Sequence, residues 1–160
     1  MKPLAILLAL LFVASAGFTA YLYLTCEVSV ISIEVSSVEA SAQSDTFEQI
    51  QNAFRLHAVT GTPFSDTVGD LSDCKFVTYR LHLRNTCFLP ASTVEVSITP
   101  MQGDILQLPD NVQHLLPSRS EGVLECTLLT GIYQHTVREF HVTYYMWGIP
   151  FTLRAMSGGQ

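Results

Sequence analysis

Charge is scarce in this chain of 160 residues. Charged residues make up 14% of the sequence, and Lys2 and Lys75 are its two lysines. The formal net charge is −6 at pH 7, so a phosphate backbone would repel the chain, and we predict no nucleic-acid partner. Hydrophobic residues reach 48%, which indicates one packed domain and not a disordered tail.

Patterns that carry catalysis or metal binding are also missing. The sequence has no GxSxG motif, no P-loop, no dinucleotide-binding glycine pattern and no CxxC. Its five histidines form no HxH, HxxxH or zinc-type Cys/His spacing. We therefore predict a protein that is not an enzyme and that has no catalytic residues, metal or cofactor. An enzyme such as a small envelope hydrolase stays the remote alternative, and it would need an acid and a histidine together in a cleft.

No charged residue occurs from Pro3 to Cys26, which is the longest apolar run of the chain. As a helix at about 1.5 Å per residue, residues 4–24 would span the roughly 30 Å hydrocarbon core of a membrane. We predict that residues 1–24 form a transmembrane anchor, or an uncleaved signal. Cleavage after Ala16 is the alternative, but it would leave a hydrophobic N-terminus exposed. A lipoprotein signal ending at Cys26 is disfavoured, because Thr25 precedes the cysteine.

The flanking charges predict the orientation of this anchor. Lys2 and the amino terminus are positive and precede the span, whereas Glu27 follows it. The positive-inside rule then leaves the N-terminus in the cytoplasm, with Tyr21 and Tyr23 at the outer interface. The chain would be a single-pass protein of the cell membrane with residues 25–160 as an extracytoplasmic domain.

The rest of the chain is dominated by alternating apolar and polar residues, which is typical of half-buried strands. One helical passage is expected within residues 44–59, where Asp45 and Glu48 have capping-box spacing. The alternation of residues 26–40 changes phase at Val30-Ile31, which predicts a bulge or a strand that changes partner. Further strands are expected in residues 75–85, 92–100, 121–130, 136–147 and 149–155, and residues 104–108 give a short strand at best.

These elements define the predicted fold class. It is mainly β: a single transmembrane helix followed by an immunoglobulin-like or fibronectin-like β-sandwich of about seven strands with one short helix. Residues 76–100 resemble the small sandwich domains of late-embryogenesis-abundant type 2 and WHy-like proteins, in which a strand, a short loop with proline and a second alternating strand follow a membrane anchor. The resemblance implies a non-enzymatic extracellular module and transfers no functional residue.

Four cysteines allow three full pairings, and export would permit disulfides. Cys74 and Cys87 bracket one strand, so an extended strand would hold them too far apart for a bridge. Cys126 lies between Leu124 and Leu128 on an apolar face, which favours a buried thiol. The sequence leaves the redox states of these three residues and of Cys26 open.

Two clusters and one loop are the candidate binding features. Arg80, His82 and Arg84 share one strand face and could meet an anionic partner, although cross-strand pairing with carboxylates is the simpler interpretation. Tyr145 and Trp147 share a face beside Gly148 and could anchor a partner or pack under a loop. The loop of residues 60–73 is long for a compact domain.

The function predicted from these features is a non-catalytic interaction or structural module. Residues 4–24 would hold it in a membrane, where we expect its partner to be another envelope protein. The alternative is a small-ligand or glycan-binding module that uses the loop of residues 60–73 together with the Tyr145 and Trp147 hairpin. The sequence identifies neither the partner nor the oligomeric state.

Overall fold

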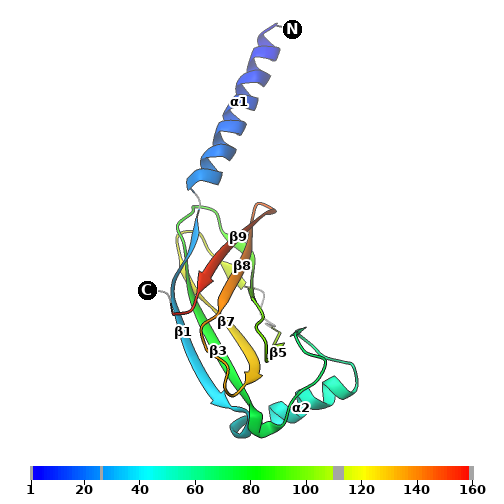
Figure 1. Cartoon of the computed structure of the whole chain (residues 1–160). Helices are drawn as coiled ribbons and strands as arrows, with labels where there is room; N and C mark the ends of the chain where they lie inside the picture. Colours follow the sequence, from blue (N-terminus) through cyan, green and yellow to red (C-terminus); the bar gives the residue numbers. More distant parts are fainter. Residues whose placement is uncertain (1, 26, 110–113, 159–160) are drawn as a thin grey trace.

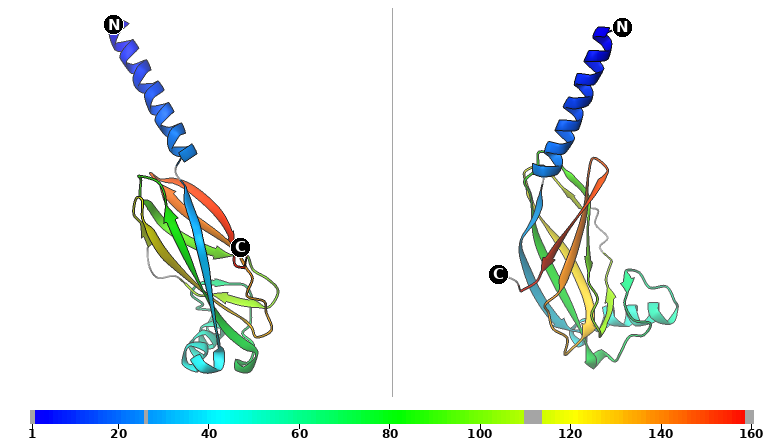
Figure 2. Two further views of the ribbon diagram at one scale, coloured as in Figure 1. Left: turned by 90° about the vertical axis from the view of Figure 1, so that its left-hand side faces the viewer. Right: turned by 45° about the horizontal axis from the view of Figure 1, so that its top comes forward.

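The computed structural model describes residues 2–25, 27–109 and 114–158. A long helix, α1 (Lys2–Thr25), projects from one end of a body made of β-strands, as Figures 1 and 2 show. A second, shorter helix, α2 (Ser44–Arg55), lies at the opposite end of that body. The body therefore has an end next to α1 and an end next to α2.

The strands form two antiparallel sheets. The five-stranded sheet has the order β1-β3-β7-β5-β2, and the four-stranded sheet has the order β6-β4-β8-β9. The strands are β1 (Val28–Glu39), β2 (Thr62–Pro63), β3 (Cys74–Asn85), β4 (Ala91–Ile98), β5 (Asp104–Gln107), β6 (His114–Leu116), β7 (Glu121–Gly131), β8 (Glu139–Met146) and β9 (Ile149–Met156). The predicted fold class is confirmed: the chain is mainly β, with an apolar N-terminal helix, one short helix and an immunoglobulin-like two-sheet body.

The main core lies between the two sheets and follows the predicted alternation. Residues Val77, Tyr79, Leu81 and Leu83 of β3 are buried there, and the residues between them face outward or lie half-buried. The ring of Tyr79 packs edge-on against Phe140 of β8 at a centroid distance of 4.9 Å. Alternating strand residues thus supply one face to the core and the other face to solvent.

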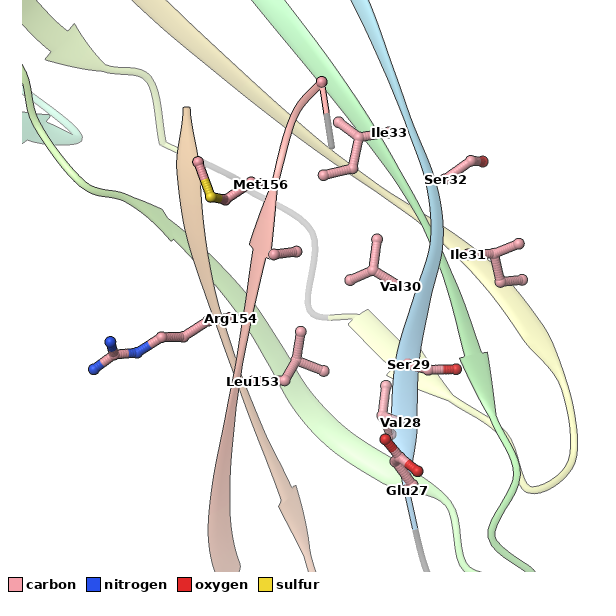
Figure 3. A pocket seen from close by; sticks show the side chains of 12 residues that line it. Glu27, Val28, Ser29, Val30, Ile31, Ser32, Ile33, Leu153, Arg154 and Met156 are labelled. Atoms are coloured by element: carbon pink, nitrogen blue, oxygen red, sulfur yellow. The ribbon is translucent and has the colours of Figure 1, made fainter. Parts of the chain in front are cut away.

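The predicted bulge in β1 is confirmed. The register between β1 and β3 shifts between Val30 and Ser32. The extra residue, Ile31, points away from the interior, so that Val30 before it and Ile33 after it both point inward in Figure 3. The bulge therefore keeps the apolar side chains of β1 on the inner face despite the change of phase.

A second core lies under α2. Phe47 and Ile50 of the helix are buried against Phe76, Leu106 and Leu129 of the five-stranded sheet. Because α2 covers the outer face of this sheet at its far end, strands β3, β5 and β7 are buried on both faces there. This explains why neighbouring residues such as Leu128 and Leu129 are both fully buried.

The predicted capping box of α2 is wrong. A short 3-10 turn, η1 (Ala40–Gln43), runs directly into the helix, so the N-cap residue is Gln43, which makes no side-chain capping bond. Asp45 lies inside the first helical turn, where its charge still favours the positive end of the helix dipole. Two short strands, β2 and β6, were also not predicted. Strand β2 lies in the predicted loop of residues 60–73, which ends in another 3-10 turn, η2 (Leu71–Asp73).

Helix α1 is the one helix in the described part of the chain that is long and apolar enough to cross a membrane. Its apolar segment covers Pro3–Tyr21, and none of that segment is buried by the rest of the chain. These properties are compatible with a membrane anchor and equally with a signal sequence.

Candidate functional site

An open groove of about 790 Å³ separates the two sheets along one side of the sandwich. One wall is the first part of β1 with the preceding Glu27, and the other wall is the second half of β9. In Figure 3 the side chains of Val30, Ile33 and Leu153 point into the space between the strands, whereas Ile31 and Arg154 point away from it. The groove therefore has an apolar interior and polar or solvent-facing outer walls. We call it the β1/β9 groove.

Both walls of the β1/β9 groove are edge strands. Within the described residues β1 pairs with β3 alone and β9 pairs with β8 alone. In a strand of this kind about half of the backbone N–H and C=O groups point away from the single neighbour. The groove thus combines an apolar floor with two rows of backbone hydrogen-bonding groups, one on each wall.

Two aromatic side chains of the four-stranded sheet stack on each other near the start of β1. Tyr144 of β8 stacks on Phe151 of β9 at a centroid distance of 5.5 Å and an interplanar angle of 13°. Burial raises the pKa of the Tyr144 phenol, although a hydrogen bond with the backbone at Val28 opposes the shift. Tyr144 therefore connects the four-stranded sheet to the start of β1.

The predicted basic cluster lies on the outer face of the five-stranded sheet, away from the groove. Arg80 Nε is 2.6 Å from Glu125 Oε1, and Arg84 Nη2 is 2.6 Å from Glu121 Oε1. His82 Nε2 lies 3.3 Å from a Glu34 carboxylate oxygen, without hydrogen-bond geometry.

Each basic side chain of the cluster thus already faces a carboxylate of a neighbouring strand. A role for Arg80, His82 and Arg84 in binding a partner stays a prediction.

The other predicted features do not meet. Trp147 and Gly148 form the turn between β8 and β9 next to α1, and Trp147 is 71% exposed. Tyr145 is half-buried and pairs across the hairpin with Pro150. The loop of residues 60–73 lies at the other end, where Thr62 and Pro63 pair with β5. The hairpin and this loop therefore form no shared pocket of the kind that the alternative function needs.

The cysteines divide into two classes. Cys87 is disulfide-bonded, whereas Cys74 and Cys126 are buried thiols, as the apolar neighbours of Cys126 predicted. Burial raises the pKa of the Cys74 thiol, and the nearby Asp73 carboxylate adds to this shift, so its reactive thiolate form is disfavoured. Cys26 lies outside the described residues.

A fully buried ion pair escaped sequence reasoning. Arg138 and Asp104 have fully buried side chains and form an ion pair, with Nη2 of Arg138 2.9 Å from Oδ1 of Asp104. Thr130 and the backbone N–H of Met101 donate further hydrogen bonds to the same carboxylate. This cluster stabilises the end of the sandwich next to α2. Among the described residues, no three His, Cys, Asp or Glu side chains lie together in a way that could hold a metal ion.

Comparisons with known proteins add little beyond the fold. No protein-family model matches the chain, so the resemblance to late-embryogenesis-abundant type 2 proteins gains no support, and no curated protein matches it significantly. The GAE domain of yeast GGA1 shares 14% identity over 56% of this chain and 94% of that chain, with a TM-score of 0.38. The GAE domain of GGA2p from Saccharomyces cerevisiae shares 12% identity over 56% of this chain and 91% of that chain, with a TM-score of 0.36. At these values the similarity says nothing about what this chain binds.

Proposed function

We propose that this chain is a single-pass membrane protein that binds an extended segment of a partner protein in the β1/β9 groove. The groove-facing edges of β1 and β9 carry this proposal, because both present unpaired backbone groups over an apolar floor. The protein acts as a non-catalytic interaction module. Helix α1 anchors it with the N-terminus in the cytoplasm and the sandwich outside, and the partner is another protein of the cell envelope.

The geometry of the groove defines what the partner segment must look like. A strand added between β1 and β9 forms backbone hydrogen bonds, which provide affinity, while its alternate side chains enter the floor and provide specificity. The part of β9 that lines the groove, Leu153 to Met156, extends about 13 Å, which limits the length of the added strand. We expect a partner segment of up to this length with apolar residues at every second position, to contact Val30, Ile33 and Leu153.

The ligand-binding alternative has weaker support, because the loop of residues 60–73 and the Trp147 hairpin lie at opposite ends of the body.

A photo-crosslinking experiment in the native membrane tests the groove. A benzophenone amino acid replaces Ile33 or Leu153 in the full chain, and the matched control replaces Ile31, which points away from the groove. We expect a specific adduct from the two groove positions and none from the control. A synthetic peptide that covers the crosslinked partner segment should then slow amide hydrogen exchange in both β1 and β9. Adducts of equal yield from Ile31, or exchange protection confined to other strands, would contradict strand addition.

The anchoring part of the proposal needs a separate measurement. We expect the native chain to resist extraction from membranes at alkaline pH. We also expect the sandwich to be digested by protease added from outside to intact cells. A mature chain that begins at Gly17 and is released in soluble form would show that α1 is a cleaved signal. That result would leave the groove proposal standing.

A further inference from the structure

Three aromatic side chains meet at the end of the sandwich that adjoins α1. Phe18 of α1 lies 6.1 Å from Phe88, which is in the loop between β3 and β4, and 6.1 Å from Trp147, in the β8–β9 turn, measured between ring centroids. We call these three residues the aromatic end. All three keep large exposed surfaces: 42% for Phe18, 42% for Phe88 and 71% for Trp147.

The loop that carries Phe88 is firmly held. The backbone N–H and the hydroxyl of Thr86 both donate hydrogen bonds to the carbonyl oxygen of Glu27, at 3.0 and 2.9 Å. The buried Asn85 donates a hydrogen bond to the carbonyl oxygen of Leu89 and accepts one from the N–H of Cys87. Phe88 is therefore exposed on a braced loop that is tied to the chain just after α1.

Trp147 occupies a position that the turn itself does not favour. Trp147 and Gly148 have φ angles of 52° and 76°, as a two-residue hairpin turn with positive φ at both central positions requires. Asparagine, aspartate or glycine relieve the strain of the first position, whereas a bulky side chain raises the free energy there. The turn thus holds a large, mostly exposed aromatic ring outward at a cost in local stability, which points to a role outside the sandwich.

The level of this cluster along α1 fits the edge of a bilayer. The apolar segment of α1 ends at Tyr21, and Phe18 lies three residues, or about 4.5 Å, before that end. Tryptophan and tyrosine concentrate at this depth in membrane proteins, because their amphipathic rings fit the layer between headgroups and hydrocarbon. The contacts with Phe18 place Phe88 and Trp147 at the same level.

We propose that the aromatic end enters the interfacial layer of the same bilayer that α1 crosses, with Trp147 and Phe88 as its anchors. The occupant of this exposed apolar surface is therefore lipid, because the surface is continuous with the membrane-facing segment of α1. The inference goes beyond partner binding, but it rests on the part of the proposed function that makes α1 an anchor. Because α1 and the aromatic end both attach to the bilayer, the tilt of the sandwich relative to the membrane is fixed. The β1/β9 groove, whose lining includes Glu27, then opens directly above the lipid surface.

Trp147 is the single tryptophan of the chain, so intrinsic fluorescence reports on this site alone. The test uses the full chain reconstituted in phosphatidylcholine vesicles that contain lipids with a spin label high or low on the acyl chain. We expect the shallow label to quench roughly half of the emission and the deep label clearly less, as suits an interfacial ring. Soluble iodide should quench weakly.

The matched control moves the fluorophore to the other end of the body. In the variant Trp147→Phe with Tyr133→Trp, the tryptophan takes the place of a side chain that is 94% exposed in the loop after β7. We expect iodide to quench this variant strongly, and both lipid labels to leave its emission unchanged. Because the control retains α1, it also shows that lipid quenching requires the aromatic end and not merely membrane attachment.

The outcomes separate this inference from the proposed anchor. If the wild-type chain floats with the vesicles but Trp147 is quenched by iodide and not by lipid labels, the inference is wrong and the anchor stands. If the chain fails to float with the vesicles, the anchor fails and the inference fails with it. Weak quenching of Trp147 by both the lipid labels and iodide would assign the surface to a second copy of the chain and would also overturn the lipid contact.

Discussion

On one side of the sandwich the two sheets are joined by buried side chains, and on the other side they are separated by the β1/β9 groove. On the joined side, β6 pairs with the first half of β4. Beyond the end of β6, the side chain of Gln107 in β5 forms hydrogen bonds with the backbone of β4. This side chain donates a 2.8 Å hydrogen bond to the carbonyl oxygen of Val96 and accepts one from the N–H of Ile98 at 3.1 Å. A side chain thus supplies the hydrogen-bonding partner that the edge of β4 lacks beyond the end of β6.

The groove side has the opposite construction. The side chains of Val30, Ile33 and Leu153, which point into the groove, are aliphatic, so they supply no donor or acceptor to the facing strand. Val30 and Leu153 are half-buried where their counterparts in the central strands are fully buried. A sandwich that leaves the backbone groups of one edge unpaired gains no stability from that edge. We therefore expect buried polar contacts elsewhere in the sandwich to contribute more to its stability.

The cluster around Asp104 is one such contact and should give the largest effect. We expect Asp104→Ala to lower the free energy of unfolding by about 3–5 kcal/mol, because it leaves the Arg138 charge buried without a partner. Denaturant unfolding of the full chain in detergent, followed by circular dichroism, measures this. The double variant Asp104→Ala with Arg138→Met should recover most of the loss, since it removes the unpaired charge as well. A loss below about 1 kcal/mol in the single variant would show that the ion pair does not secure this end.

The two edges themselves can be compared by one substitution in each. We expect Gln107→Leu to cost about 2 kcal/mol, because two buried backbone groups of β4 lose their partner. On the groove side, Leu153→Gln should cost about 1 kcal/mol or less, since its new amide reaches water in the open groove. The same unfolding measurement serves both variants. Equal losses, or a larger loss for Leu153→Gln, would show that the groove side is as tightly built as the joined side.

The sequence predicted those parts of the molecule that depend on local periodicity. The alternating faces of β3, β7 and β8 and the bulge after Val30 follow from the alternation of apolar and polar residues, which tertiary contacts here reinforce. The start of α2 was misjudged because the 3-10 turn before it alters the local backbone, and such a turn has no strong sequence signal.

The groove could not be predicted, because it depends on which strands end up at the edges of the two sheets. Strands β1 and β9 are the first and the last strand of the sandwich along the chain, and the sequence of neither strand indicates that it pairs with one neighbour only. Likewise, Arg138 falls within the predicted strand of residues 136–147, and only the tertiary structure shows that its charged side chain is buried. Its proximity to Asp104 arises from segments 34 residues apart.

The smallest effect is expected on the outer face of the five-stranded sheet, where Arg84 pairs with Glu121. Both side chains are more than half exposed, so water and salt screen the pair, and a double-mutant cycle of Arg84→Ala with Glu121→Ala should yield a coupling energy of roughly 0.2–1 kcal/mol. Because this coupling is weak, the guanidinium of Arg84 is still available to an anionic partner. The Arg84→Ala variant therefore also tests whether the basic cluster binds a partner. If the cluster serves only to pair strands, we expect Arg84→Ala to leave the yield of crosslinks from the groove positions unchanged. A lower yield would show that the partner in the β1/β9 groove also contacts the outer face of the five-stranded sheet.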